Sequence, residues 1–208
     1  MSTKFTQEDN AVPLRTRLRE IRAALPDEQR RRGALLMRGR LFTWLAVARD
    51  AALKAGRPAP AIVAAYWPMQ DEPDLRPLLE QWAEAGITVA LPAVRERNQP
   101  LEFRPWTPDA PMAEGPYGIQ EPLAGAVVMP DLVLVPTLGY TPLADRVGYG
   151  GGYYDRTLAA LKAAGHPHTT IGVAWSCGRL DPIEHVPAAH DVRLDAVLTP
   201  DGWLPKAP

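Results

Sequence analysis

Residues 146–155 read RVGYGGGYYD and combine a cationic side chain with a backbone that could surround an anion. Glycine lacks a Cβ, so a glycine-rich loop can bring its N–H groups close to phosphate oxygens. Arg146 adds a planar guanidinium that can pair with a phosphate through two hydrogen bonds. The pattern favours a phosphate-binding loop, and the glycines alone leave a flexible turn open as the alternative.

An acid, Asp155, follows the same glycines. A carboxylate beside bound phosphates would repel them unless a cation lay between, and Mg²⁺ is the usual cation in such sites. The glycine spacing differs from the G-x-x-x-x-G-K-[ST] and G-x-G-x-x-G patterns of other nucleotide-binding loops. The sequence therefore predicts a magnesium and phosphate site of another design.

Residues 66–74, YWPMQDEPD, form a second candidate site after a predicted strand. Trp67 offers a flat ring, and the carboxylate of Glu72 could accept hydrogen bonds from a ring with N–H donors, such as a pterin. The alternative is structural, because Asp71, Glu72 and Asp74 would all be favourable in the first turn of a helix. The residues alone leave both interpretations open.

Two further loops carry polar residues at constrained positions. EGPYGIQEP at 114–122 places Tyr117 and Glu121 among proline and glycine, and its function stays open. HDVRLDAVLTP at 190–200 places Asp195 at the start of a predicted strand. A carboxylate at a strand edge could be a second metal ligand, or it could cap the start of the strand.

Apolar runs and helical periodicities alternate along the chain, as in α/β proteins. Pro13 is the expected first helical residue after a polar, flexible leader at 1–12, and residues 107–130 are expected to form an ordered loop. The pattern predicts one three-layer α/β/α domain over 1–208 with a mostly parallel central sheet. The predicted helices cover 13–25, 27–55, 75–85 and 153–165, and the predicted strands cover 61–67, 87–94, 101–106, 131–137, 169–175 and 194–200.

Composition narrows the classes of function. The formal net charge of −1 gives no general attraction to nucleic acid or to an anionic membrane. The single cysteine, Cys177, excludes an intramolecular disulfide and indicates a reducing compartment. The polar first residues and the lack of a long apolar run indicate neither a signal peptide nor a membrane span. The sequence predicts a cytoplasmic protein.

These loops, in this order, resemble the 5-formyltetrahydrofolate cyclo-ligase family, also called methenyltetrahydrofolate synthetase. RVGYGGGYYD is similar to the family signature R-L-G-x-G-x-G-Y-Y-D, with Val147 in place of leucine. YWPMQDE resembles the family's first substrate loop, and YGIQEP resembles its mid-chain motif. The resemblance covers nearly the whole chain, from the arginine-rich first helix to the strand at Asp195.

The resemblance implies an Mg²⁺- and ATP-dependent ring closure. In the family's reaction, 5-formyltetrahydrofolate becomes 5,10-methenyltetrahydrofolate, and ADP and phosphate are released. The formyl oxygen attacks the γ-phosphate to give an N5-iminium phosphate, and N10 then displaces the phosphate. It also implies a monomer that binds folate and ATP, while the net charge and the lack of a long apolar run predict no nucleic acid and no membrane as partner.

The family's site residues carry over by position. Arg146 and Tyr153 would be catalytic, and Asp155 and Asp195 would bind Mg²⁺. The expected ATP contacts are Arg15, Arg146, Val147, Gly148, Tyr149, Gly150, Gly151, Gly152, Tyr153 and Tyr154. The expected folate contacts are Trp67, Glu72, Tyr117, Tyr149, Gly150, Gly151, Gly152 and Tyr153.

The chain departs from the family pattern at a few positions. Ala11 stands where the family has a nucleotide-contacting lysine, so either Lys4 supplies the amine or Arg15 and Arg146 suffice. Thr137 and Thr141 occupy positions where the family often has glycine and aspartate. These changes keep open an alternative function, a nucleotide- or folate-binding regulator without catalysis. Arg146 is also expected to be exposed, so that its replacement would reduce activity far more than stability.

Overall fold

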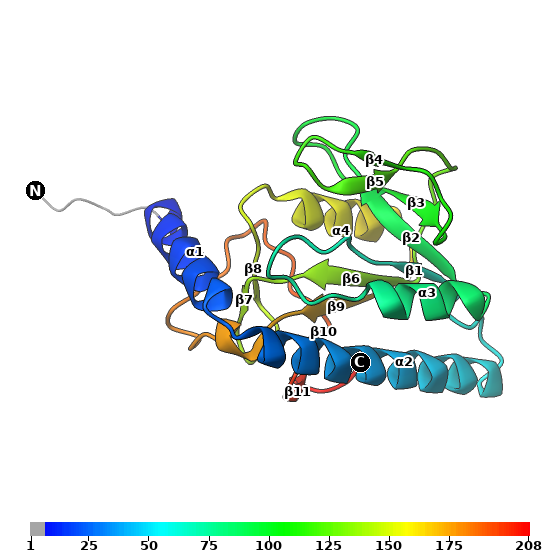
Figure 1. Cartoon of the computed structure of the whole chain (residues 1–208), viewed down its shortest axis with the longest axis horizontal. Helices are drawn as coiled ribbons and strands as arrows, with labels where there is room; N and C mark the ends of the chain where they lie inside the picture. The colour runs from blue at the N-terminus through cyan, green and yellow to red at the C-terminus, as the bar shows by residue number, and fades with distance from the viewer. Residues whose placement is uncertain (1–6) are drawn as a thin grey trace, which may run out of the picture.

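The computed structural model describes residues 7–208, with side chains from residue 13 onward. Figure 1 shows a central sheet with helix α2 (Asp27–Lys54) along one face and helix α4 (Tyr153–Ala163) on the other. Helix α3 (Arg76–Glu84) shares a hydrophobic core with α2. This three-layer α/β/α arrangement confirms the predicted fold class.

The main sheet has the strand order β11-β10-β9-β6-β1-β2-β3. Its inner strands, from β10 to β2, pair in parallel, and the edge strands β3 and β11 are antiparallel to their neighbours. The parallel pair that the strand–helix–strand unit at 61–94 predicts is confirmed, because β1 pairs with β2. The bounds are β1 Ile62–Ala64, β2 Thr88–Ala93, β3 Glu102–Trp106, β6 Leu132–Pro136, β9 Thr169–Val173, β10 Ala196–Thr199 and β11 Gly202–Leu204.

Strand alternation divides the interior into two cores. Leu132 and Leu134 of β6 pack toward α2 and α3, whereas Val133 and Val135 pack toward α4. Buried on both faces, β6 reads as a continuous apolar run, which is typical of a central parallel strand. Burial of each such side chain contributes about 1.5–3 kcal/mol to the stability of the fold. The sheet therefore holds the loops at its edge in place.

Helix α1 (Gln7–Ala23) lies beside the three layers and extends away from the sheet edge (Figure 1). The predicted start at Pro13 is wrong, because Pro13 lies inside the helix. Leu18 packs against Leu138, Val147 and Leu180, which belong to loops and to β8 rather than to the main sheet. Residues 1–6 of the predicted leader, including Lys4, lie outside the described residues, as does the side chain of Ala11.

Short strands account for most of the differences from the predicted elements. The expected loop at 107–130 contains a hairpin of β4 (Met112–Glu114) and β5 (Gln120–Pro122). A second pair joins β7 (Gly139–Tyr140) to β8 (Arg146–Val147). Strands of two or three residues are too short to show a period-2 pattern, so no local pattern predicts them.

Candidate active site

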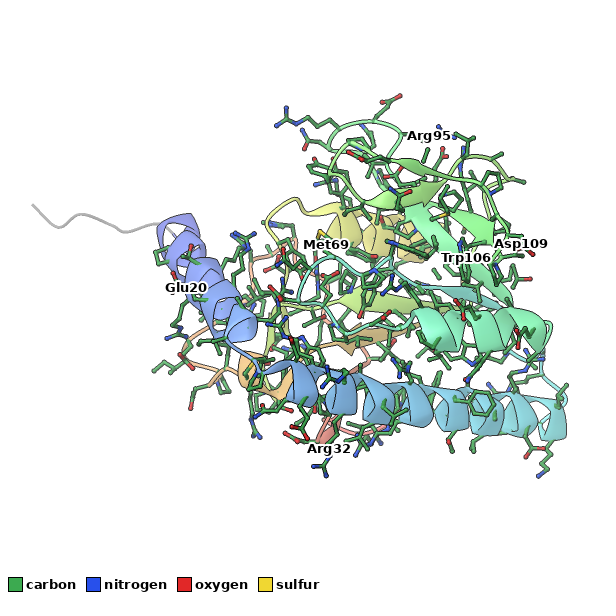
Figure 2. The ribbon with its side chains drawn as sticks, viewed as in Figure 1. Glu20, Arg32, Met69, Arg95, Trp106 and Asp109 are labelled. Atoms are coloured by element: carbon green, nitrogen blue, oxygen red, sulfur yellow. The ribbon has the colours of Figure 1, made fainter. Side chains whose placement is uncertain are left out.

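The candidate site lies where the parallel strands end. The loops that follow β1, β6 and β9 leave the same edge of the sheet, which is where ligands bind in open α/β folds. Two of these loops touch, because the indole N–H of Trp175, after β9, donates a hydrogen bond of 2.7 Å to the carbonyl of Asp71, after β1. Figure 2 shows Met69 of the first loop near the middle of the molecule, below α4 in that view.

The glycine loop, residues 148–152, connects β8 to α4. A Cβ at Gly148 would lie 2.5 Å from the Arg146 guanidinium, so a side chain here would require the guanidinium to move. Gly150 has a φ of 98°, which side chains rarely adopt. Helix α4 begins at Tyr153 without a side-chain cap, so its first turn offers N–H donors and a positive dipole end to an anion. This geometry suits the predicted phosphate-binding loop.

Arg146 is buried, and the expectation that it is exposed is wrong. Its side chain is 6% exposed, and its Nη2 lies 2.7 Å from Oδ2 of Asp155. Its Nη1 also lies 3.5 Å from the carbonyl of Pro136. Pairing of β8 with β7 draws this arginine inward. Removing one partner of a buried ion pair costs about 3–5 kcal/mol, so we expect Arg146→Ala to reduce stability as well as activity.

Helix α1 reaches the glycine loop through one row of arginines. Nε of Arg15 donates to the carbonyl of Gly148 at 3.1 Å, and Arg19 donates to the carbonyl of Tyr149 at 3.3 Å. Arg22 donates to the hydroxyl of Tyr149. The structure therefore places Arg15 beside the loop, as the sequence predicts. The side chain of Val147 is buried against Leu18, which leaves only its backbone for a ligand.

Glu72 joins the loop that is expected to bind folate, residues 66–74 (the folate loop), to the glycine loop. Its side chain is buried, its Oε2 accepts a 2.8 Å hydrogen bond from the N–H of Met69, and its Oε1 accepts one from the hydroxyl of Tyr149. Burial raises the pKa of Glu72, and the hydrogen bonds from Tyr149 and Met69 and the charge of Arg22 oppose that rise. Two predicted sites thus meet at one buried carboxylate.

Trp67 extends this site toward β3. Its ring lies edge-on to Trp106 with centroids 6.0 Å apart, and the guanidinium of Arg76 lies 5.7 Å from the centroid of Trp67. Asp74 takes up the helix-start role of the structural alternative, because its Oδ1 accepts a 3.0 Å hydrogen bond from the backbone N–H of Arg76, the first residue of α3, while its carboxylate also pairs with the Arg76 side chain. Trp67 is partly buried, so one part of the ring remains accessible to a ligand.

Tyr117 brings the β4–β5 hairpin onto the glycine loop. Its hydroxyl lies 2.9 Å from that of Tyr153, and the two rings meet edge-to-face at 5.7 Å. Tyr117 is 56% exposed, so this contact leaves a surface at the mouth of the site. Glu121 is structural, since its carboxylate accepts a 3.2 Å hydrogen bond from the N–H of Val94 in the β2–β3 connection. The structure thus unites Tyr117 with Tyr153.

Asp155 and Asp195 bind different partners in the structure. Asp195 sits at the amino end of β10, where its Oδ2 accepts hydrogen bonds of 2.7 and 2.8 Å from Thr170, while Asp155 is paired with Arg146. Oδ1 of Asp155 accepts a hydrogen bond from the N–H of Val192 at 3.3 Å. Across the described residues, no group of three or more His, Cys, Asp or Glu could hold a metal ion. A Mg²⁺ ion shared by Asp155 and Asp195 fits this arrangement poorly.

Tyr154 carries a buried hydroxyl that no neighbour satisfies. Within residues 13–208 its Oη has no hydrogen-bond partner, and burial raises the pKa of Tyr154 well above its ordinary value. The guanidinium of Arg146 lies 5.9 Å from the ring centroid. A buried polar group without a partner is costly in a native protein, so this O–H is suited to a ligand atom.

The sequence interpretation missed Arg22 and Arg30. Arg15, Arg19 and Arg22 recur at helical spacing on one face of α1, which could have indicated a shared target. Arg30 of α2 pairs with the carboxylate of Asp71, and its Nη2 donates to the carbonyl of Ala23 at 2.7 Å. Asp71 has a positive φ of 68°, which aspartate tolerates better than most residues. Only long-range packing brings Arg22 and Arg30 to their partners, so no local motif predicts these contacts.

Comparison with known proteins gives a consistent result. A model described as the 5-formyltetrahydrofolate cyclo-ligase family matches residues 7–200. The chain is 34% identical over 196 residues to a 5-formyltetrahydrofolate cyclo-ligase of Mycolicibacterium smegmatis, covering 90% of this chain and 92% of that protein. It is 32% identical over 146 residues to the Escherichia coli protein of the same name, covering 66% and 77%.

Solved structures agree with these sequence matches. The NMR structure of Aquifex aeolicus 5,10-methenyltetrahydrofolate synthetase is similar with a TM-score of 0.70 and 26% identity, covering 93% of this chain and 91% of that one. The synthetase of Mycoplasma pneumoniae has the same fold, with a TM-score of 0.67 and 21% identity over 91% of this chain and 98% of that one. The chain therefore belongs to the 5-formyltetrahydrofolate cyclo-ligase family of enzymes.

Proposed function

We propose that this enzyme uses ATP to close the ring of 5-formyltetrahydrofolate, giving 5,10-methenyltetrahydrofolate, ADP and phosphate. The observation that carries the proposal is the hydrogen bond between Tyr149 and Glu72, which joins a phosphate-type loop to a carboxylate suited to a pterin. Phosphoryl transfer to a formyl oxygen requires the two substrates to meet, and this contact puts their expected sites side by side.

The phosphate side of the site consists of charge and backbone. Arg146, Arg15 and the first turn of α4 would neutralise the ATP phosphates, and the glycine loop would let them approach closely. To pair with a phosphate, Arg146 would share its guanidinium between the ligand and Asp155. The ion pair with Asp155 would hold Arg146 in place before the nucleotide binds.

The folate side consists of rings and one acceptor. Glu72 would accept hydrogen bonds from pterin N–H groups, and Trp67 would offer a flat surface to the ring. Tyr153, held by Tyr117, would border the formyl group. The free O–H of Tyr154 lies in the same buried region as Glu72 and could donate to either substrate.

The proposed reaction needs positioning more than covalent help from the protein. The formyl oxygen attacks the γ-phosphorus of ATP, and the bond from that phosphorus to the bridging oxygen breaks, releasing ADP. N10 then attacks the formyl carbon of the N5-iminium phosphate and loses its proton, and the carbon–oxygen bond breaks to release phosphate. Arg146 would stabilise charge on the transferred phosphoryl group, which is the main task in such transfers.

Mg²⁺ belongs to the proposal as the companion of ATP, where it would neutralise phosphate charge. The assignment of Asp155 and Asp195 as its ligands stays a prediction that the geometry does not favour, so no step of the reaction is assigned to them.

We further propose a cytoplasmic monomer that consists of one domain. One sheet draws its strands from residues 62–204, which supports a single folding unit. The lone cysteine and the net charge of −1 support a reducing compartment and no nucleic-acid partner. Over residues 7–208, no helix has the length and apolar character to cross a bilayer.

The test is spectroscopic. With 5-formyltetrahydrofolate and Mg-ATP, the purified enzyme should generate the near-ultraviolet absorbance of the methenyl product. Folded protein at saturating ligands that gives no such signal would contradict the proposal. Calorimetric binding of both ligands without turnover would instead identify the non-catalytic binding protein that the departures at Ala11, Thr137 and Thr141 left open.

A further inference from the structure

Arg22 is a buried cation at the end of α1. It is 9% exposed, and its Nε has no hydrogen-bond partner within residues 13–208. Its Nη1 donates to the hydroxyl of Tyr149, and its guanidinium carbon lies 5.4 Å from the centroid of the same ring. Burying a cation is costly unless it is paired or hydrogen-bonded. The side chain of Arg22 donates its hydrogen bond to Tyr149.

The chain of contacts continues to the folate loop. The hydroxyl of Tyr149 accepts from Arg22 and donates to Oε1 of Glu72, so each lies in hydrogen-bond contact with the next. The other oxygen of Glu72 is fixed by the N–H of Met69 at 2.8 Å. A carboxylate held at both oxygens has one orientation, and its remaining lone pairs define where a ligand can donate.

We propose that Arg22 is a positioning residue for folate recognition, which acts through the hydroxyl of Tyr149 to orient the carboxylate of Glu72. The inference rests on the proposed function, because it assigns Glu72 to the folate. It extends the role of α1 from the nucleotide, through Arg15, to the second substrate. Helix α1 would then contribute to the binding of both substrates.

The surroundings of Glu72 make its charge sensitive to Arg22. The groups that face it are Arg22 and the hydroxyls of Tyr66, Tyr149 and Tyr154, and Arg22 is the cation among them. Burial raises the pKa of Glu72, and Arg22 lowers it. Without that cation, the carboxyl would take up its proton at higher pH, and an O–H donor would replace part of its capacity to accept from the pterin.

The experiment measures the dissociation constant of 5-formyltetrahydrofolate by calorimetry without ATP, and then the KM values of both substrates. For Arg22→Met we expect folate to bind about ten-fold to a hundred-fold more weakly, with the KM for ATP changed by about two-fold or less. The acid limb of folate binding should move to higher pH. Arg17→Met is the matched control, since Arg17 lies on the same helix but pairs with Glu184 at the surface.

Tyr149→Phe separates positioning from general structure. It keeps the ring beneath Arg22 and removes only the hydroxyl that connects Arg22 to Glu72. If Arg22 acts through that hydroxyl, then at a pH where Glu72 is ionised in every variant the double variant should bind folate no more weakly than Tyr149→Phe alone. Effects that multiply would overturn the proposal, as would unchanged folate binding in Arg22→Met or an equal loss for ATP and folate.

Two further measurements keep the outcomes distinct. Arg22→Gln retains N–H donors without the charge, so it serves where Arg22→Met does not fold, and it should shift the pH profile more than the affinity at high pH. Wild-type enzyme that does not bind folate would contradict the proposed function itself. Wild-type binding that Arg22→Met and Arg22→Gln both leave unchanged would contradict only the role of Arg22.

Discussion

Helices α1 and α2 follow one another in the chain and are both rich in arginine, yet they attach to the molecule in different ways. Helix α2 buries Met37, Leu41 and Leu45 against the sheet. Helix α1 buries mainly Leu18, against loops, and its arginines supply the rest of its attachment. Apolar burial therefore holds α2 in place, whereas α1 is held by polar contacts with the glycine loop.

The arginines of the two helices show the same division. On α2, Arg38 donates to the carbonyl of Asp74 at 2.9 Å, and Arg40 donates to that of Pro200 at 2.7 Å. These hydrogen bonds attach neighbouring loops to α2. On α1, Arg15 and Arg22 end on the glycine loop, where substrates are expected. We infer that substitutions in α2 change stability and that substitutions in α1 change substrate binding.

The largest expected effect is on the stability that α2 provides. Leu41 is fully buried, so Leu41→Ala should lower the free energy of unfolding by about 2–5 kcal/mol through lost burial and a cavity. Both KM values should stay the same for the molecules that remain folded. Urea denaturation measures the change, and Leu35→Ala, on the exposed side of α2, is the matched control with a change of about 0.5 kcal/mol or less. A large shift in KM for Leu41→Ala would contradict the inference that α2 contributes to stability and not to substrate binding.

The next effect belongs to α1. Arg15→Met should raise the KM for ATP about ten-fold to a hundred-fold, because the cation beside Gly148 is lost. The free energy of unfolding should change by about 1 kcal/mol or less, since Arg15 is only partly buried. Steady-state kinetics and urea denaturation of the same preparation check both values. A stability loss as large as that of Leu41→Ala would show that α1 is structural after all.

Arg30 lies between these cases, because it belongs to α2 but holds the folate loop through Asp71. Its replacement by methionine should cost about 1 kcal/mol of stability, as for a partly exposed ion pair, and should raise the KM for folate more than that for ATP. Asp71→Asn should give the same pattern, since asparagine also tolerates the positive φ. Arg32→Met is the control, because Figure 2 shows Arg32 pointing away from the sheet.

The smallest effect is a pH dependence at the contact between the two loops. Burial raises the pKa of Glu72, so its contribution to stability is present at low pH and is lost as pH rises through that raised value. The free energy of unfolding of wild type should therefore fall relative to Glu72→Gln as pH rises from about 4.5 upward. Urea denaturation at several pH values measures the difference. Parallel curves for the two proteins would contradict a raised pKa.

The sequence was sufficient for the layers and for the residues of each loop, because long apolar runs and the glycine signature are local patterns. It placed Arg15, Glu72, Tyr117 and Tyr153 in elements that the structure brings to one place. The sequence was not sufficient where a side chain pairs with a residue far away in the fold. Arg146 was expected to be exposed but is paired with Asp155. The role of Asp195 as a metal ligand stays a prediction, and in the structure its carboxylate accepts hydrogen bonds from Thr170.

The contact between Arg22 and Tyr149 illustrates the same limit. Its two residues are 127 positions apart in the sequence, and no local motif at either residue predicts the contact. The register of α1 against the glycine loop depends on Leu18 packing on Val147, which is a tertiary contact. Helical spacing could show that three arginines share a face, but only the fold shows what that face meets.

The most direct measurement compares product amounts in a single reaction. Purified enzyme with limiting 5-formyltetrahydrofolate and excess Mg-ATP should release ADP, phosphate and the methenyl product in equal amounts, because each ring closure consumes one phosphoryl transfer. Glu72→Gln should form far less methenyl product while remaining folded. ADP released without methenyl product, or methenyl product formed equally by Glu72→Gln and wild type, would contradict a site in which Glu72 and the glycine loop act on two substrates together.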